Sequence, residues 1–414
     1  MSTRPVLVTA LQGAGWHPAA WRVAGPAARR LTSLRHWRDV VVEQDRAGTD
    51  AVTLEDSFTA GPLNQEGDLD TRTVVGRLDA LLVASAVAPA TRAVGLVPTV
   101  SVTHTEPFHV ATGLQTLDHV SAGRAGWRIQ VSPTAREAAL FGRRPGGDDA
   151  ATLFAEAREV AEVVSRLWDS WDDDAIIRDV ATGRFIDRDR IHGAAFVGEH
   201  VSVHGASIVP RSPQGRPPVF ALAHRADAAA FAADAADVVL VTPGGAGPSG
   251  SAGPTGGPGP SHGAGLEARG ALALVRDAEQ AAGSDVRRPV LADLAVLVGA
   301  SASEAADALA ALDAAAGSSY AEASDAPVLA TTVPELVSLV GDLASLGYAG
   351  VRLRPLRIPE DSTAVARRLV PALVAAGLRA DVASRPTADL RTRLGVAPAV
   401  SRYARTTADQ EVPA

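Results

Sequence analysis

The sequence predicts an α/β fold, a (β/α)8 TIM barrel with insertions. Short apolar runs alternate along the chain with longer segments whose apolar residues recur at helical spacing. Eight strand candidates can be placed, enough to close a barrel. A doubly wound sheet needs the same alternation but usually fewer units, so the barrel is the preferred prediction. A hydrophobic fraction of 46% over 414 residues is sufficient to bury a large core.

Local sequence signals mark the ends of the first three predicted helices. The first helix ends before Gly48, the second stops before Pro89, and Gly123 follows the third, all of which are ordinary helix-ending signals. The predicted strands cover residues 5–11, 50–56, 93–101, 126–132, 218–223, 237–242, 289–298 and 350–354. The predicted helices cover residues 34–47, 77–87, 107–118, 153–168, 226–235, 266–282, 333–346 and 364–376.

Two segments interrupt the alternation within what we expect to be a single barrel domain, residues 1–414. Residues 172–217 are polar and rich in turn signals, and they are predicted to form an insertion with short strands. Residues 244–265 are rich in Gly and Pro and are predicted to form a flexible loop after the sixth strand. That loop would be either a lid over the C-terminal rim or a tolerated surface expansion, and the expansion is favoured.

Composition excludes several chemistries. Cysteine is absent, and all 39 basic residues are arginine. No disulfide, thiolate metal site, cysteine nucleophile or lysine Schiff base is therefore available. A net charge of −8 gives no overall attraction to nucleic acid or to an anionic membrane. No signal peptide or membrane-spanning run is recognisable, so a cytoplasmic protein is expected.

Two apparent motifs are set aside. The G-x-G-x-x-G pattern at residues 245–250 arises by chance in a Gly-rich segment, since no helix opens at its third Gly. His192, His200 and His204 do not have the spacing that places two metal ligands on one helix face, and they are interpreted as scattered surface residues. No metal site is predicted.

Polar residues near strand ends are candidates for a pocket at the barrel rim. Asp56 ends the second strand, and Thr99 and Ser101 end the third; each could contact a ligand or serve a turn. His104 precedes a helix that starts at Pro107, so it is either a pocket residue or part of helix-start chemistry. The Trp/His/Trp/Arg cluster at residues 16–22 could stack on a planar ring or simply anchor its loop.

Several stretches of the sequence match motifs of one known protein family, and they occur in the same order as in that family. They include GWHPAAWR (15–22), TEPFH (105–109), TLDHVSAGRAGW (116–127), DVATGRFID (179–187) and VPRSPQGRP (209–217). The chain resembles the bacterial luciferase-like flavin-dependent monooxygenase superfamily, in its nitrilotriacetate and dibenzothiophene-sulfone monooxygenase branch. The resemblance covers most of the chain.

The resemblance implies an FMN(H2)-dependent monooxygenase built on a TIM barrel, with reduced FMN at the C-terminal rim. A separate flavin reductase would supply the FMNH2, and O2 would oxygenate a small organic substrate. No catalytic side chain is assigned, because the flavin would carry the chemistry. The resemblance also implies a homodimer.

Site residues can be carried over position by position. Asp56 and Thr99 match family residues at the flavin ring, and Arg128 stands where the family usually has Asn, at the pocket edge. The family's His-x-x-x-Tyr pair falls on Ala150 and Phe154. The family's Gly-Ser-Ser phosphate turn reads Ala-His-Arg, which places His224 and Arg225 at the phosphate.

These departures leave two alternatives to an active enzyme. One is a non-catalytic paralogue that has lost flavin and acts as a binding protein. The other is a barrel that uses another flavin-like cofactor, such as a deazaflavin.

Overall fold

The computed structural model describes residues 4–61, 68–244, 262–380 and 388–404. Eight parallel strands form a closed barrel, as the sequence predicts. Their order is β1-β2-β3-β4-β9-β10-β11-β13, with β13 pairing back to β1, and β10 pairs with β11 to complete the ring. The barrel strands are β1 (Val6–Leu11), β2 (Ala51–Leu54), β3 (Gly95–Ser101), β4 (Trp127–Gln130), β9 (Val219–Leu222), β10 (Val238–Val241), β11 (Val290–Val298) and β13 (Gly350–Pro355).

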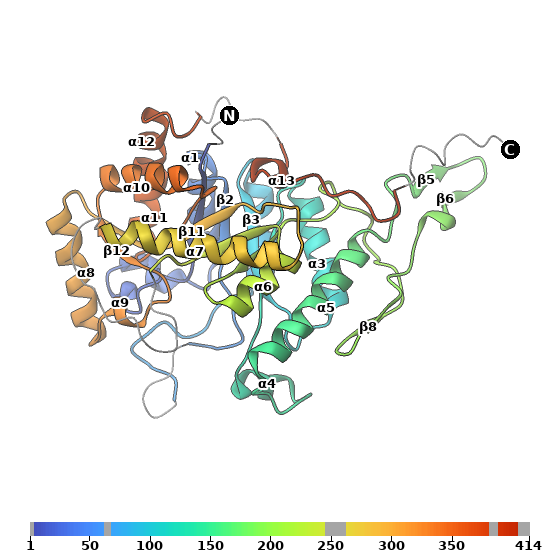
Figure 1. The fold of residues 1–414 in the computed structure, drawn as a ribbon, viewed down its shortest axis with the longest axis horizontal. Helices are drawn as coiled ribbons and strands as arrows, with labels where there is room; N and C mark the ends of the chain where they lie inside the picture. Colours follow the sequence, from blue (N-terminus) through green and yellow to red (C-terminus); the bar gives the residue numbers. More distant parts are fainter. Residues whose placement is uncertain (1–3, 62–67, 245–261, 381–387, 405–414) are drawn as a thin grey trace.

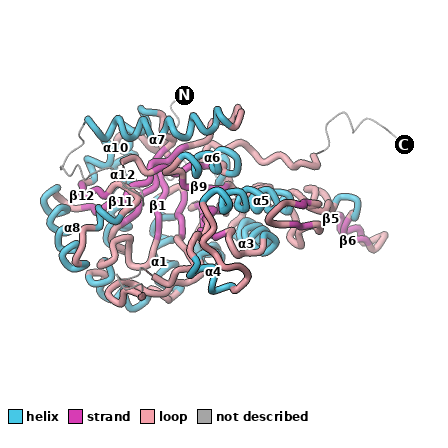
Figure 2. Tube along the Cα trace, turned by 60° about the horizontal axis from the view of Figure 1, so that its bottom comes forward, coloured by secondary structure: helices cyan, strands magenta, loops and turns pink. Residues whose placement is uncertain are grey.

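Helices surround this barrel, with the strands at the centre of the molecule (Figure 2). The longer helices are α1 (Leu34–Ala47), α2 (Ala80–Val87), α3 (Pro107–Val120), α4 (Ala135–Phe141), α5 (Ala150–Trp168), α6 (Ala226–Ala235), α7 (His262–Ala281), α8 (Ala302–Ala316) and α10 (Val333–Leu346). Shorter ones are α9 (Tyr320–Ala323), α11 (Glu360–Ala364), α12 (Val370–Ala375) and α13 (Leu390–Arg393). Within the described residues, no helix combines the length and the apolarity needed to cross a membrane.

Residues 172–217 contain two small antiparallel pairs, as predicted for this segment. β5 (Ile176–Asp179) pairs with β6 (Arg184–Ile186), and β7 (Phe196–Val197) pairs with β8 (Ser202–Val203). This part of the chain extends beyond α3 and α5, away from the barrel (Figure 1). Most of the Gly/Pro-rich segment predicted as a loop, residues 245–261, lies outside the described residues.

Several features differ from the sequence prediction, among them the short helices α4, α9 and α13, which were not predicted. The helix α8 and the strand β12 (Val328–Thr331) were not predicted, because α8 is mostly alanine and gives little hydrophobic periodicity, and β12 has four residues. β12 extends the sheet along the edge of β11 beyond the part that pairs with β10. The predicted helix 364–376 is interrupted by a π-helical turn at Val365–Leu369, followed by Pro371, which has no N–H for an α-helical hydrogen bond.

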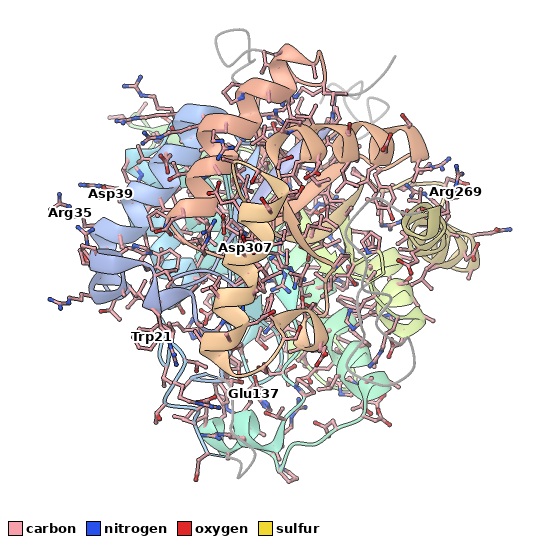
Figure 3. The ribbon with its side chains drawn as sticks, turned by 90° about the vertical axis from the view of Figure 1, so that its left-hand side faces the viewer. Trp21, Arg35, Asp39, Glu137, Arg269 and Asp307 are labelled. Atoms are coloured by element: carbon pink, nitrogen blue, oxygen red, sulfur yellow. The ribbon has the colours of Figure 1, made fainter. Side chains whose placement is uncertain are left out.

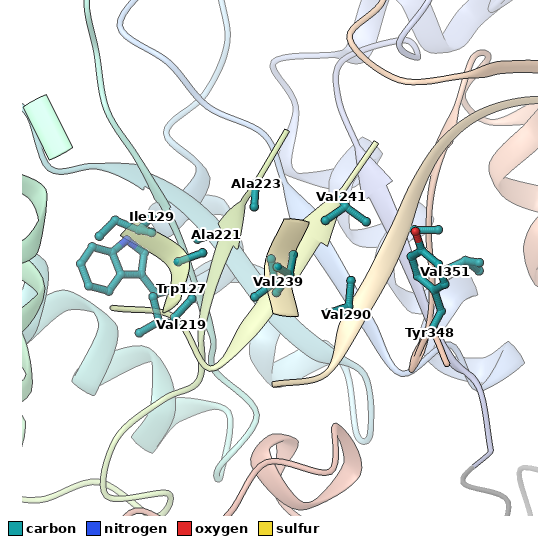
Figure 4. Close-up of a cluster of buried hydrophobic side chains, with 14 of the residues drawn as sticks. Trp127, Ile129, Val219, Ala221, Ala223, Val239, Val241, Val290, Tyr348 and Val351 are labelled. Atoms are coloured by element: carbon teal, nitrogen blue, oxygen red, sulfur yellow. The ribbon is translucent and has the colours of Figure 1, made fainter. Parts of the chain in front are cut away.

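Side chains alternate across the barrel wall as strand geometry requires. Outward residues such as Trp127, Ile129, Val239 and Val351 pack under the helices in the main apolar core (Figure 4). Inward residues form two layers. The lower layer is apolar, with Val8, Phe220, Leu240 and Leu291 packed against Leu390 and Leu394 at the C-terminal end of the described chain. The upper layer, near the carboxyl ends of the strands, is polar.

Candidate functional site

The upper layer of the barrel interior is a network of three arginine and three carboxylate side chains, all of them buried except that of the partly exposed Asp325. Its members are Glu55 after β2, Arg128 on β4, Asp293 on β11, Arg352 and Arg354 on β13, and Asp325 before β12. Arg352 and Asp293 are fully buried. Burying a charge is costly unless it is paired, and here the formal charges cancel and each group has an opposite partner.

Arg352 is the central residue of this network. It ion-pairs with Glu55, donates from Nη1 to Asp293 Oδ2 at 2.6 Å, and donates from Nε to Thr53 Oγ1 at 3.0 Å. Arg354 is two residues further along the same inward face. It donates to both oxygens of Asp293, at 2.9 and 2.6 Å, and pairs with Asp325. Strand β13 therefore fixes one side of the site with two guanidinium groups.

Trp16 covers these guanidinium groups. The centroid of its ring lies 4.5 Å from the Arg354 guanidinium carbon and 5.6 Å from that of Arg352. Its indole N–H donates to the carbonyl of Ala10 at 3.0 Å, which holds the ring on the end of β1. Trp21 of the same cluster lies at the surface instead, with its N–H on the carbonyl of Arg72 (Figure 3). The Trp/His/Trp/Arg cluster thus divides between the barrel and its exterior.

Arg128 enters the network from β4. Its Nη1 donates to Glu55 Oε2 at 2.8 Å, to Thr99 Oγ1 at 3.1 Å and to Gln130 Oε1 at 3.1 Å. Its Nε is buried and has no hydrogen-bond partner in the described part of the chain. Burial lowers the pKa of Arg128, and Glu55 opposes that effect. Since an arginine stays protonated in proteins, Arg128 is a fixed cation with an unused donor.

The pKa of Glu55 reflects the same network. Burial would raise it, but the positive charges of Arg128, Arg352 and Arg354 outweigh burial and hold the pKa below its ordinary value. The pKa of Asp325 is also held below its ordinary value, because burial would raise it but the positive charge of Arg354 outweighs that effect. Both carboxylates are therefore ionised at neutral pH, as the pairing of charges requires.

A cavity of about 180 Å³ lies beside Arg128, at the ends of β4 and β9. Three of the six residues predicted for cofactor binding, Arg128, Phe154 and His224, line it together. Its other lining residues are mostly apolar: Ile129, Gln130, Val131, Ala221, Leu222, Ala228 and Phe231. The cavity combines apolar walls with a few polar groups, the composition typical of small-molecule sites.

His224 and Phe154 differ in what they offer to this cavity. His224 Nδ1 is buried without a hydrogen-bond partner among the described residues, and burial lowers the pKa of this imidazole. Phe154 stacks on Phe231, with ring centroids 5.3 Å apart, and supplies no hydrogen bond. Two polar side chains that line the cavity, Arg128 and His224, thus each carry a buried nitrogen without a hydrogen-bond partner among the described residues.

Arg225 lies outside this cavity, next to the N-terminus of α6. It is the N-cap residue of this ten-residue helix, which has no side-chain cap. Its Nε donates to Asp227 Oδ1 at 3.1 Å, and the pair is substantially exposed. Exposed ion pairs contribute little free energy, so this guanidinium can exchange partners at small cost.

Asp56 and Thr99 line a second cavity, of about 190 Å³, between the ends of β2 and β3 and helix α3. The Asp56 carboxylate accepts hydrogen bonds from the backbone N–H groups of Ser57 and Ala80, both at 2.8 Å. Burial raises the pKa of Asp56, against these two hydrogen bonds. Thr99 joins the two cavities, because its hydroxyl also accepts a hydrogen bond from Arg128.

Glu55, Asp293, Arg352 and Arg354 were not predicted as site residues. Their signal is present in the sequence, because these charged residues occupy alternate positions of strands that are otherwise apolar. By the same alternation Thr53 and Glu55 face the barrel interior, whereas Leu54 packs outward and Asp56 accepts a hydrogen bond from the first N–H of α2.

His104 and the insertion histidines lie elsewhere. His104 has φ 70°, stacks on Phe141 with centroids 5.1 Å apart, and does not line either cavity. His192 Nε2 lies 3.0 Å from Asp172 Oδ1, and its ring stacks on Tyr403. Within the described parts of the chain, no group of three or more His, Asp or Glu side chains is arranged to hold a metal ion.

A parallel eight-stranded barrel with a polar site at the carboxyl ends of its strands defines the class of protein as a TIM-barrel protein. The chain matches the family model for the luciferase-like monooxygenases over residues 13–253, more than half its length. It belongs to that family, as the sequence motifs indicated.

Relatives with curated names agree with the family and with the branch inferred from the motifs. N-acetyl-S-(2-succino)cysteine monooxygenase of Bacillus subtilis (strain 168) is 33% identical over 229 residues, which are 55% of this chain and 50% of the relative. Nitrilotriacetate monooxygenase component A of Aminobacter aminovorans is 33% identical over 234 residues, 55% of this chain and 51% of the relative. Dibenzothiophene-sulfone monooxygenase of Rhodococcus erythropolis is 34% identical over 204 residues, which are 48% of this chain and 44% of the relative.

The chain thus spans about half the length of the curated relatives it matches. Among solved structures, a long-chain alkane monooxygenase superposes with a TM-score of 0.80 and 21% identity, covering 95% of this chain and 96% of the other. A riboflavin lyase superposes with a TM-score of 0.79, also at 21% identity, with coverage of 95% and 96%. At this level of identity the likeness establishes the fold.

Proposed function

We propose that this protein is a flavin-dependent monooxygenase that binds reduced FMN at the carboxyl ends of the barrel strands. It would use O2 to oxygenate a small organic substrate. Family membership over residues 13–253 supports this proposal. The single structural observation that carries it is the mostly apolar cavity at the rim that Arg128, Phe154 and His224 line together.

The residues present fit the two ends of FMN. For the phosphate, the N-terminus of α6 offers backbone N–H groups and the positive end of the helix dipole, with Arg225 beside it. For the ring, the apolar walls and the polar side chains of Arg128, Gln130 and His224 suit a flat group with polar atoms at its edge. A cavity of about 180 Å³ is smaller than a typical cofactor site, so the rim must open to admit the whole molecule.

Reduced FMN, when bound, supplies the two electrons that let O2 transfer one oxygen atom to the substrate and release the other as water. The protein's own residues have simpler tasks. Arg225 and α6 would hold the phosphate, Arg128 and Thr99 would orient the ring, and Phe154 with Phe231 would exclude water from one wall. No protein nucleophile is required.

The partners are part of the proposal. A separate flavin reductase would supply the reduced flavin, as the family resemblance implies. The relatives' printed names include nitrilotriacetate and N-acetyl-S-(2-succino)cysteine, so small polar organic molecules are the first substrates to screen. We also propose a homodimer, which light scattering on the purified protein would test.

The test is an anaerobic titration of the purified protein with photoreduced FMN, followed by fluorescence, and a matching titration with oxidised FMN. Saturable binding of the reduced form supports the proposal. Absence of saturable binding of either form would contradict it and would favour the non-catalytic paralogue. Arg225→Ala should weaken FMN more than riboflavin, since riboflavin has no phosphate; an equal loss for both would refute the phosphate role of Arg225.

A further inference from the structure

A third cavity, of about 690 Å³, lies at the opposite end of the barrel from the proposed flavin site, at the amino ends of β9, β10 and β11. Val219, the first residue of β9, lines it, whereas Leu222, the last residue of the same strand, lines the cavity beside Arg128. Two of its sides are α5 and the C-terminal end of α6, and residues 286–289 and 395–399 complete it. Its volume is within the range of small-molecule sites, roughly 300–1,000 Å³.

Arginines from separate parts of the chain converge on this cavity. It is lined by five arginines and three carboxylates, an excess of two positive charges in a chain whose net charge is −8. A cleft lined by one sign of charge raises the local concentration of ligands of the opposite sign. The arginines are Arg158, Arg216, Arg287, Arg288 and Arg391.

The three carboxylates already have partners. Asp234 accepts a hydrogen bond from Arg158 Nε at 2.7 Å, and Asp237 accepts two from Arg391, at 2.8 and 3.2 Å. Glu162 is shared by two arginines that do not line the cavity. The remaining three arginines therefore have no carboxylate of their own in the lining.

Arg216 has a distant counter-charge that it shares. Its Nη1 donates to Ser165 Oγ at 3.0 Å, and its Nη2 donates to the carbonyl of Val400 at 2.9 Å. Its Nε lies 3.8 Å from Asp169, a carboxylate that pairs with Arg211 at closer range. Hydrogen bonds to a hydroxyl and a carbonyl satisfy the donors of Arg216 but leave its charge only partly balanced.

Arg287 and Arg288 are in the same position on another side of the cavity. Arg288 Nε donates to the carbonyl of Ala236 at 2.7 Å, and its Nη1 is 3.9 Å from Glu279, which Arg276 holds at 2.8 Å. Arg287 is exposed, and it makes no hydrogen bond or ion pair with any residue that the structure describes. The cavity thus offers one free cation and two whose charges are incompletely balanced.

Apolar side chains form much of the remaining surface. They include Ala161 and Trp168 on α5, Ala235 on α6 and Pro289 before β11. Val286, another lining residue, is 63% exposed, so apolar surface is open to solvent here. Covering that surface with an apolar group is favourable. Apolar walls with a few polar groups are the composition of small-molecule sites.

We propose that this cavity binds a small organic anion with an apolar body, such as an aryl carboxylate or an aryl sulfonate. The charges of Arg216, Arg287 and Arg288 would attract the anionic group, and the apolar body would lie on the walls formed by α5 and α6. Charge pairs are stronger beside apolar walls than in open solvent. The site is separate from the proposed flavin site, so the inference does not depend on FMN binding.

The probe for the test is 8-anilinonaphthalene-1-sulfonate, followed by its fluorescence, and its uncharged counterpart is N-phenyl-1-naphthylamine. The parent should bind the sulfonate saturably. Arg287→Glu should weaken that binding by roughly tenfold at low ionic strength, because it reverses the one free positive charge among the described lining residues. Arg287→Gln, which removes the charge without reversing it, should lie between. Binding of the uncharged probe should change by less than about twofold in both variants.

Arg269→Glu and Arg225→Glu are the matched controls. Each makes the same change of charge, the first on α7 at the surface (Figure 3) and the second beside the proposed flavin site. Both should bind the sulfonate within about twofold of the parent. Arg287→Glu should keep the thermal unfolding midpoint of the parent, since Arg287 has no partner among the described residues to lose, and this separates a lost site from a damaged fold.

Three results would overturn the inference. They are no saturable binding of the sulfonate by the parent, unchanged binding in Arg287→Glu, and equal losses in all three charge reversals. A loss in Arg225→Glu without one in Arg287→Glu would place the probe at the carboxyl end of the barrel and would also contradict the proposed site. The FMN function is tested separately and stands or falls on its own titration.

Discussion

Arg128 Nη1 lies 2.8 Å from Glu55 Oε2, so a cation on β4 pairs with a carboxylate after β2 across the intervening strand β3. The pair lies inside the barrel near the carboxyl ends of its strands. Glu55 also pairs with Arg352, so this carboxylate is shared between the cavity residue Arg128 and an arginine of β13. The stability of the fold and the proposed flavin binding therefore involve the same carboxylate.

Replacing Glu55 by Gln should destabilise the fold. The amide leaves Arg128 and Arg352 as neighbouring buried cations without their shared counter-charge, and breaking a buried pair costs about 3–5 kcal/mol. Urea denaturation followed by circular dichroism measures the free energy of unfolding. Glu106→Gln is the control, because Glu106 pairs with Arg143 at an exposed site, where less than about 1 kcal/mol is expected. Equal effects of the two substitutions would contradict the importance of the network.

Acid should weaken the fold through the same carboxylate. The pKa of Glu55 in the folded protein lies below its ordinary value of 4.5, because the arginine charges outweigh burial. A depressed pKa contributes stability above the unfolded value, and that stability is lost as the pH falls through the folded pKa. The free energy of unfolding should thus decline below about pH 4.5. In the Glu55→Gln variant the free energy of unfolding should decline less steeply between pH 5 and pH 3. An unchanged slope would show that Glu55 does not cause the loss of stability in acid.

Gly15→Ala should disturb the loop that carries Trp16. Gly15 has φ +129°, and a Cβ there would lie 2.2 Å from the carbonyl oxygen of Leu356, a backbone atom that cannot move aside cheaply. The loop must shift, so Trp16 loses its position over Arg354, and we expect a loss of more than about 2 kcal/mol. Gly270→Ala is the control within α7, where a Cβ meets open space, and it should stabilise by up to about 1 kcal/mol. Thermal denaturation of both variants gives the comparison.

Sequence patterns predicted the barrel because eight apolar strands and their helices leave a strong periodic signal. They did not predict α8, whose alanine-rich face gives little contrast between its sides. The cofactor-binding roles of the six residues stay predictions: Arg128, Phe154 and His224 line one cavity, whereas Arg225 lies beside it and Asp56 lines another. Glu55 was passed over in favour of its neighbour Asp56, because choosing between them requires the direction of each side chain at the end of β2. Pairing among Glu55, Asp293 and Arg352 depends on contacts between residues about 60 to 300 positions apart, which no local pattern encodes.

Phe154 offers a gain-of-binding prediction. It lines the cavity beside His224, and Ala150 is four residues earlier on α5, so the two positions lie on the same face of the helix. These are the positions where the family resemblance places a His-x-x-x-Tyr pair. The double substitution Ala150→His and Phe154→Tyr would add an imidazole and a hydroxyl with little change in volume at position 154. If the cavity and the N-terminus of α6 hold FMN, the two new donors should strengthen FMN binding by roughly tenfold, which is about the contribution of one hydrogen bond to the binding free energy.

Riboflavin distinguishes the possible origins of that gain. A gain for FMN that exceeds the gain for riboflavin would place the new groups at the phosphate, and an equal gain for both would place them along the ring or its side chain. The single substitution Phe154→Tyr separates the hydroxyl from the imidazole. Because Phe154 stacks on Phe231, and tyrosine can keep that stacking, its thermal stability should match that of the parent. A double variant that folds normally and binds FMN no better than the parent would show that α5 does not contribute to the flavin site of this protein.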